Sequence, residues 1–245
     1  MKRKGMTIIM IYLENVSYKY PQNSSLIINN LSACFKRGEI TAISGKNGSG
    51  KTTLTKLLAG MLIPTRGCIT IDEKKTEGMD LFEIGQKVGY AFQNPNKQLF
   101  CDTAHNEIAF GLRNLQQTKD KQSKKYKIHK KHDNTVSQSD ADTNEKSISE
   151  ISDRYLSLFG LDKYRDTYPG KLSLGEKQRL VLAAVLALGT SYLVLDEPTT
   201  GLDLIRQREL CDILTNLRDV NHCGIVIVSH DIDFVNSFAD SILYL

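Results

Sequence analysis

Nine consecutive residues, Gly45 to Thr53, combine three glycines with two lysines and three hydroxyl side chains. They match the pattern G-x-x-x-x-G-K-S/T in full. Because glycine has no side chain, phosphate oxygens can approach the backbone, whose successive N–H groups then face the anion. Lys51 is expected to reach the β- and γ-phosphates of a nucleotide, and the Thr52 hydroxyl to bind Mg²⁺. The predicted phosphate site contains Gly45, Asn47, Gly48, Ser49, Gly50, Lys51, Thr52 and Thr53.

The segments on either side of this loop are those that a phosphate loop requires. Ile40 to Ser44 reads as a buried strand, and Leu54, Leu57 and Leu58 form the apolar stripe of a helix that starts near Thr52. The N-terminal end of that helix adds positive potential. The alternative is a Gly/Lys turn that matches by chance, but the order strand, loop, helix argues against it.

Two carboxylates, Asp196 and Glu197, end a second apolar stretch that begins at Tyr192. In a parallel sheet, ligands bind at the carboxyl ends of the strands. We expect Asp196 to hold Mg²⁺ through water, and Glu197 to orient or deprotonate the attacking water. Alone, the pair would be interpreted as a solvated strand end. Beside a complete phosphate loop, that interpretation is disfavoured.

Three further residues are weaker candidates. Gln93 and His230 each follow an apolar strand, and together they offer a polar contact to water or Mg²⁺ and a donor toward the γ-phosphate. Tyr20 has two interpretations: an aromatic at the edge of the core, or a residue that stacks on adenine.

Composition restricts the class of protein. The 245 residues are 40% hydrophobic and 24% charged, as in soluble proteins, and the formal net charge is only +4, which predicts no nucleic-acid partner. The five cysteines lack metal-binding spacing and read as reduced thiols of a cytosolic protein. Basic residues precede a short apolar run at the N-terminus, but the run alternates like a strand. No stretch is long enough to span a bilayer, so any membrane role is expected through partners.

Apolar strands alternate with helical segments along the chain, which predicts a mainly parallel sheet covered by helices. Residues 10–20 read as an edge strand. Residues 116–150 differ from the rest, with eight lysines, six acidic residues and no hydrophobic period, and we predict a disordered insertion there. His129 and His132, within it, are candidate metal ligands, but nothing else in the segment completes a site, and a solvated charged segment is the favoured interpretation.

The order of these motifs resembles that of ABC-type ATPase domains, from about Tyr12 to Leu245 without the insertion. Residues 172–179, Leu-Ser-Leu-Gly-Glu-Lys-Gln-Arg, are similar to the family signature L-S-G-G-Q followed by K-Q-R. The resemblance implies that Ser173 and Gly175 contact the γ-phosphate of an opposite subunit. It also implies that Asp203, the last residue of the motif Thr-Gly-Leu-Asp at 200–203, belongs to the nucleotide-binding site. The chain departs from the signature at Leu174 and Glu176.

A narrower resemblance concerns residues 93–100, Gln-Asn-Pro-Asn-Lys-Gln-Leu-Phe, and residues 107–111, Glu-Ile-Ala-Phe-Gly. They are similar to the ATPase subunits of energy-coupling factor (ECF) transporters, which take up vitamins or transition-metal ions. The family usually has acidic residues where this chain has Asn96 and Lys97. Such ATPases often continue with a helical extension, whereas this chain ends at Leu245, so a dimer contact made there is not expected.

The resemblance implies one phosphate-loop ATPase domain over residues 1–245, binding ATP and Mg²⁺. Its expected parts are a RecA-like core of about 1–92 and 191–245, with an antiparallel β edge, and a helical subdomain of about 93–190. Implied partners are a second ATPase subunit, identical or paralogous, a transmembrane coupling subunit and a substrate-binding membrane subunit. The implied location is the cytoplasmic side of the cell membrane.

Other classes of ATPase offer alternatives. Chromosome-maintenance ATPases need long heptad coiled coils, and translation-factor types need two ATPase domains; the sequence has neither. Another type of ABC transporter ATPase stays open, and Glu197 argues against a non-hydrolysing regulator. Glu176 places a carboxylate near the phosphates where an amide is usual, so we expect an asymmetric pair in which this signature completes the less active site.

Overall fold

The computed structural model describes residues 10–22, 24–127, 138–200 and 202–245. The chain forms two compact units. The first comprises the chain up to Gln93 together with Thr190–Leu245, and the second comprises Asn94–Gly189. The bounds expected from the sequence lie within one residue of these junctions.

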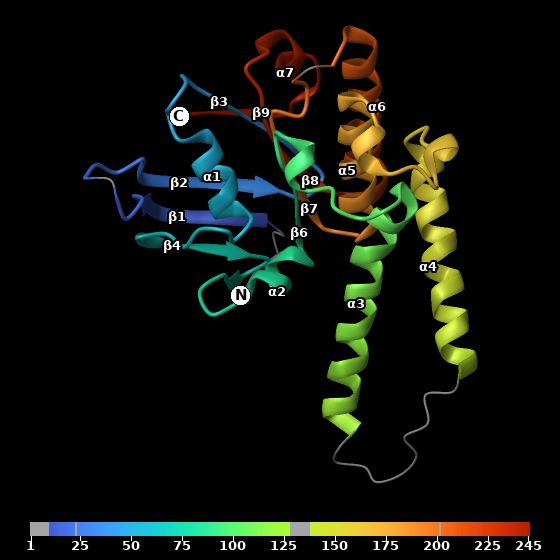
Figure 1. Cartoon of the computed structure of the whole chain (residues 1–245). Coiled ribbons are helices and arrows are strands. Elements are labelled where there is room, and N and C mark those ends of the chain that lie inside the picture. The colour runs from blue at the N-terminus through green and yellow to red at the C-terminus, as the bar shows by residue number, and fades with distance from the viewer. Residues whose placement is uncertain (1–9, 23, 128–137, 201) are drawn as a thin grey trace, which may run out of the picture. The chain divides into compact units, whose positions relative to one another are not determined.

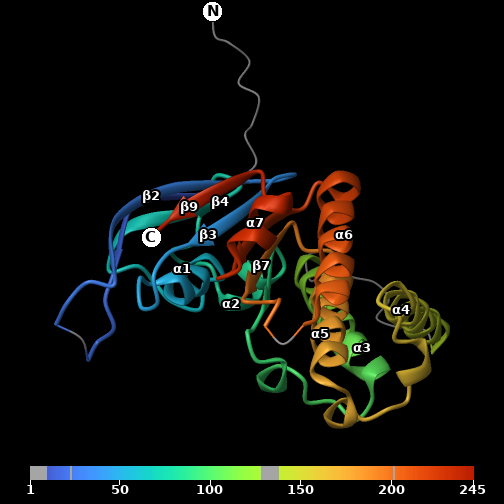
Figure 2. The same ribbon diagram turned by 90° about the horizontal axis from the view of Figure 1, so that it is seen from above.

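A five-stranded parallel sheet forms one layer of the first unit. Its order is β6 (Val88–Ala91), β7 (Tyr192–Asp196), β8 (Gly224–Val228), β3 (Ile40–Ser44) and β9 (Ser241–Tyr244). Every residue of β6, β7 and β8 is buried, which explains why these strands read as unbroken apolar runs. Figure 2 shows β9, from the end of the chain, beside β3, which carries the phosphate loop. The fold class predicted from the sequence is confirmed.

The antiparallel strands form a separate four-stranded sheet, in the order β2 (Ile28–Lys36), β1 (Met10–Tyr18), β4 (Arg66–Ile71) and β5 (Lys74–Lys75). The expectation that β1 is an edge strand was wrong, because it pairs with β2 on one side and with β4 on the other. Alternation along a single strand indicates which face is buried but says nothing about which edges are paired.

Helices complete the first unit: α1 (Lys51–Leu58), α2 (Leu81–Gly85), α6 (Leu204–Asn221) and α7 (Ile232–Phe238). The apolar face of α1 joins one hydrophobic core with strands of both sheets, through Leu54 and Leu57 together with Leu13 of β1 and Val194 of β7. All four of these side chains are at most 1% exposed. The phosphate loop is therefore held between a strand and a helix that the core fixes in place.

The second unit is helical (Figure 1). Its elements are η1 (Pro95–Lys97), α3 (Ala104–Lys127), α4 (Gln138–Leu158), η2 (Asp162–Tyr164), η3 (Pro169–Lys171) and α5 (Leu174–Ala187). Buried apolar side chains of α3, α4 and α5, such as Ile108, Leu156 and Leu180, hold the three helices together. In the part of the chain that the structure describes, no helix is both long and apolar enough to cross a bilayer.

The structure differs from the sequence prediction for residues 116–150. α3 continues through 116–127 and α4 covers 138–150, so the described residues of this segment are helical (Figure 1). Extending a helix that is already packed needs no new nucleus, so polar residues can continue it. His129 and His132 lie outside the described residues. Within those described, no three His, Cys, Asp or Glu side chains are arranged to hold a metal ion.

Replacing residues 119–143 by a short Gly/Ser linker should leave the expected ATP affinity unchanged within about twofold, because every residue lining the cavity at the phosphate loop belongs to the first unit. This deletion keeps the ion pair between Arg113 and Glu145 and the buried Ile148. Fluorescent-ATP titration is the measurement. Removing all of 116–150 also takes away Glu145 and Ile148, and should lower the melting temperature. A clear loss of ATP affinity in the shorter deletion would contradict the expectation.

Candidate active site

Four strand ends meet at one edge of the parallel sheet. The phosphate loop follows β3, Glu197 follows β7, His230 lies two residues beyond β8, and Gln93 lies two residues beyond β6. Since β6, β7, β8 and β3 are adjacent and parallel, their carboxyl ends lie side by side. Topology alone therefore gathers side chains that are far apart in the sequence.

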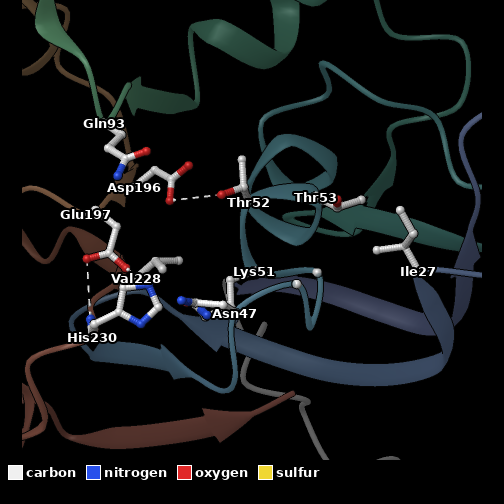
Figure 3. A pocket seen from close by; sticks show the side chains of 12 residues that line it. Ile27, Asn47, Lys51, Thr52, Thr53, Gln93, Asp196, Glu197, Val228 and His230 are labelled. Atoms are coloured by element: carbon white, nitrogen blue, oxygen red, sulfur yellow. Dashed lines mark hydrogen bonds and ion pairs between the residues drawn. The ribbon is translucent and has the colours of Figure 1, made fainter.

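A cavity of about 300 Å³ opens at this edge (Figure 3). It is lined by Ile27, Asn47, Gly48, Gly50, Lys51, Thr52, Thr53, Gln93, Asp196, Glu197, Val228 and His230. Ten of these twelve residues are among the site residues predicted from the sequence. They come from two stretches that are far apart in the chain, 47–93 and 196–230. The volume lies at the lower end of the range that small-molecule sites occupy.

The loop's glycines are required by its backbone. Gly48 and Gly50 have φ values of 82° and 102°, which side-chain-bearing residues rarely adopt. A Cβ atom on Gly45 would lie 2.5 Å from the carbonyl oxygen of Leu245, and one on Gly50 would lie 2.8 Å from a methyl group of Ile28. Gly50 also caps α1, whose N-terminus thus faces the loop. The backbone is shaped to place N–H groups around an anion.

Polar atoms inside this loop are suited to bind phosphate oxygens. Lys51 is 7% exposed, and its Nζ donates to the carbonyls of Gly45 and Lys46 at 2.9 and 3.0 Å. An ammonium group has three donors, so one stays available for an anion. Ser49 Oγ is buried and has no hydrogen-bond partner among the described residues. The chemistry of the loop therefore fits the phosphates of a nucleotide.

Thr52 and Asp196 provide oxygen atoms of the kind that Mg²⁺ prefers. The Thr52 hydroxyl donates to Asp196 Oδ1 at 3.4 Å, and the two side chains face each other in Figure 3. Asp196 is 4% exposed, and this burial raises its pKa, while hydrogen bonds from Thr52 and Tyr90 oppose the rise. A divalent cation would stabilise the ionised carboxylate.

Glu197 lies next to His230 and has an unusual backbone. Its φ of 54° is in the left-handed region, a local strain that is found most often at functional sites. Its Oε2 accepts the backbone N–H of His230 at 3.3 Å, and His230 Nε2 lies 3.0 Å from Oε1. Burial raises the pKa of Glu197, and the nearby His230 opposes that rise. Both oxygens of Glu197 thus face His230, Oε2 its backbone N–H and Oε1 its ring.

Other predicted site residues do not line the cavity. Tyr20 is half-buried, contacts the Thr53 hydroxyl at 3.4 Å and packs edge-to-face with Tyr18, so it lies beside the loop and both interpretations of it stay open. Asp203 is the N-cap of α6 and accepts the N–H of Arg206 at 2.8 Å. Gly45 and Ser49 belong to the loop but not to the cavity wall.

The signature residues Ser173 and Gly175 belong to the second unit. Ser173 is the N-cap of α5, and its hydroxyl donates to Glu176 Oε2 at 2.8 Å. The same carboxylate accepts the Ser173 N–H at 2.9 Å and, on its other oxygen, the Tyr164 hydroxyl. The Tyr164 hydrogen bond is the main cause that lowers the pKa of Glu176 to about 2. Glu176 is therefore turned back onto Ser173 in a capping box. In the sequence, the spacing of three residues between a serine and a glutamate is a signal for such a box.

Sequence reasoning missed three residues near the site. Ile27 and Val228 form apolar parts of the cavity wall, and nothing in their local sequence distinguishes them from core residues. Tyr90 donates to Asp196 Oδ2 at 3.3 Å. Its signal was available, since a tyrosine within a fully buried strand needs a partner for its hydroxyl.

Comparisons with known proteins agree with this geometry. Residues 28–200 match the family described as ABC transporter. The chain is 36% identical over 236 residues to a putative ABC transporter ATP-binding protein of Pyrococcus abyssi, covering 96% of this chain and 80% of that protein. It is 37% identical over 220 residues to the energy-coupling factor transporter ATP-binding protein EcfA1 of Fusobacterium nucleatum, covering 89% of this chain and 72% of that protein.

Two solved structures share the fold. CbiO1 from Clostridium perfringens, part of the ABC transporter complex cbiONQ, has a TM-score of 0.76 and 28% identity, covering 97% of this chain and 84% of that one. The ATP-binding cassette MJ0796, solved as a dimer with ADP and phosphate, has a TM-score of 0.76 and 26% identity. The match covers 96% of this chain and 94% of that one. The phosphate loop, the carboxylate pair and these matches together identify the chain as a member of the ABC transporter family, an ATP-binding subunit that hydrolyses ATP.

Proposed function

We propose that this ATPase powers an ECF-type importer of a vitamin or a transition-metal ion, docked on the cytoplasmic side of the cell membrane. Relatives named as ECF transporter ATP-binding proteins and the CbiO1 neighbour support this assignment. The expected partners are a second ATPase subunit, a transmembrane coupling subunit and a substrate-binding membrane subunit.

In this proposal the cavity residues have distinct roles. The loop from Gly45 to Thr53 and the N-terminus of α1 bind the phosphates, and the Lys51 ammonium neutralises their charge. Thr52, Asp196 and Gln93 would hold Mg²⁺, which would neutralise negative charge on the phosphates. Glu197 accepts a hydrogen bond from the attacking water and takes its proton, while His230 donates toward the γ-phosphate.

An exposed aromatic pair carries the proposal that this chain docks on a membrane partner. Phe100 and Phe110 are 66% and 44% exposed, and their rings pack edge-to-face with centroids 4.9 Å apart. Glu107 fixes the backbone beside them, since its carboxylate accepts the N–H groups of Phe100 and Cys101 at 3.0 and 2.7 Å. Exposed aromatic side chains on a fixed backbone are typical anchors of protein interfaces.

The same surface is linked to the signature helix. Lys177 of α5 donates to Asn96 Oδ1 at 2.8 Å, and η1 packs against α5. Asn96 stands where the related ATPases usually have an acidic residue, and it still accepts from the lysine. A helix of the coupling subunit docked at Phe100 would therefore act on α5, which carries Ser173 at its N-cap.

Phe100→Ser should release the chain from its membrane complex. The test is co-expression with the membrane proteins encoded by the neighbouring genes, followed by measurement of the chain retained on membranes and of ATP-driven solute uptake. Loss of one aromatic anchor costs about 2 kcal/mol, or roughly 30-fold in affinity. The control is Phe82→Ser, at an exposed aromatic of α2 in the first unit. Full retention and uptake with Phe100→Ser would contradict the docking role.

A further inference from the structure

A buried tyrosine lies beside the metal-binding carboxylate without any part in the roles described so far. Tyr90 is 7% exposed on β6 and pairs with Val194, two residues before Asp196 on β7. Its ring packs edge-to-face on Phe92 with centroids 4.9 Å apart, and its hydroxyl donates to Asp196 Oδ2 at 3.3 Å. The hydroxyl thus lies against side chains of both α1 and β7.

The contacts of Tyr90 form a closed circuit around the proposed Mg²⁺ ligands. From Asp196 Oδ2 the circuit passes to the Tyr90 hydroxyl, then to Thr55 Oγ1 at 3.2 Å. Thr55 Oγ1 donates to the Thr52 carbonyl at 2.9 Å, and the Thr52 hydroxyl returns to Asp196 Oδ1 at 3.4 Å. The two oxygens of Asp196 are thus held from two sides, one by α1 and one by β6.

A count of protons assigns direction within this circuit. Thr55 has one hydroxyl proton, and its shortest contact is to the Thr52 carbonyl, so the Thr55 oxygen competes with Asp196 for the proton of Tyr90. Tyr90 also has one proton, and an ionised carboxylate is a stronger acceptor than a hydroxyl. The Tyr90 proton is therefore directed at Asp196 Oδ2 whenever Asp196 is charged, which leaves Oδ1 directed at Thr52.

We propose that Tyr90 is a positioning residue for Mg²⁺, which holds Asp196 Oδ2 so that Oδ1 and the Thr52 hydroxyl form a preset pair of metal-binding oxygens. This inference rests on the proposed function, because it assumes that ATP binds here with Mg²⁺. Outer-shell partners that fix a metal ligand's orientation commonly change metal affinity by about 10-fold or more when they are removed.

The test is Tyr90→Phe in the full chain, which removes one oxygen and keeps the ring. The measurement is the Mg²⁺ concentration needed for half-maximal binding of a fluorescent ATP analogue, with a parallel ATP titration in EDTA. The Mg²⁺ requirement should rise about 10-fold. Affinity for ATP in EDTA should stay within about twofold, because the phosphate loop is untouched.

The matched control is Tyr192→Phe, which deletes the hydroxyl of another buried tyrosine of the same sheet. That hydroxyl donates to Asp72 Oδ1 at 2.6 Å, and neither residue lines the cavity. This variant should leave the Mg²⁺ requirement unchanged. Thr55→Val removes the competing acceptor and keeps the Tyr90 hydroxyl on Asp196, so the Mg²⁺ requirement should stay unchanged or fall. A rise in that variant would contradict the positioning role even if Tyr90→Phe does not fold. In Tyr90→Phe, an unchanged requirement, or equal losses with Mg²⁺ and with EDTA, would overturn the positioning role. Failure of the wild-type chain to bind ATP would instead overturn the proposed function.

Discussion

Glu197→Gln is expected to keep ATP binding and to reduce ATP turnover by about 100-fold or more, the scale of a general-base contribution. The change replaces a carboxylate oxygen that can accept a proton from water by an amide, and leaves Lys51 and the loop intact. Phosphate release by the chain assembled with its partners measures turnover, and fluorescent-ATP titration measures binding. The control is Glu209→Gln on the exposed face of α6. Wild-type turnover in the Glu197 variant would show that the role given to this residue is wrong.

The same assay tests the asymmetric pair. The signature of this chain completes the site that contains the partner's own glutamate, whereas Glu197 lies in the site completed by the partner's signature. The Ser173 hydroxyl is already engaged with the Glu176 carboxylate, so contact with a γ-phosphate would have to displace that bond and bring two negative groups together. Changing the partner's glutamate should therefore cost less activity than Glu197→Gln. Equal losses, or an active homodimer as the native form, would contradict the asymmetric pair.

Lys51→Met should lower ATP affinity roughly 10- to 100-fold, as expected for the loss of one or two hydrogen bonds to a charged group, and turnover should fall with it. Methionine keeps most of the length and apolar volume of the side chain, so the wall of the cavity stays filled while the ammonium is lost. Fluorescent-ATP titration and phosphate release are the measurements.

The control for that change is Lys74→Met, at an exposed lysine of β5. This variant makes the same chemical replacement and alters the net charge equally, so it separates the local contact from a general electrostatic effect. An ATP affinity for Lys51→Met equal to that of the Lys74 variant would contradict the role of Lys51.

The sequence by itself determined most of the cavity wall. Gly50, Lys51 and Thr52 were predicted as a group because a phosphate loop is a local structure, whose backbone conformation is set by neighbouring residue types. Asp196 and Gln93 could be added because apolar runs revealed the strands, and the rule for parallel sheets placed their ends together. Local pattern and one topological rule were sufficient there.

Only the tertiary structure decided how the side chains pair. Tyr90 contacts Asp196 across neighbouring strands that are about 100 residues apart in the sequence, and such a register cannot be read from either strand alone. The carboxylate of Glu176 was expected to face a nucleotide, but a capping box with Ser173 and the Tyr164 hydroxyl turn it back. Residues 116–127 were expected to be disordered, but they continue a helix whose packed half supplies the nucleus. The Tyr90 contact is distant in sequence, whereas the capping box and the helix extension are local, but in all three the folded structure fixes an orientation or a conformation that residue types leave open.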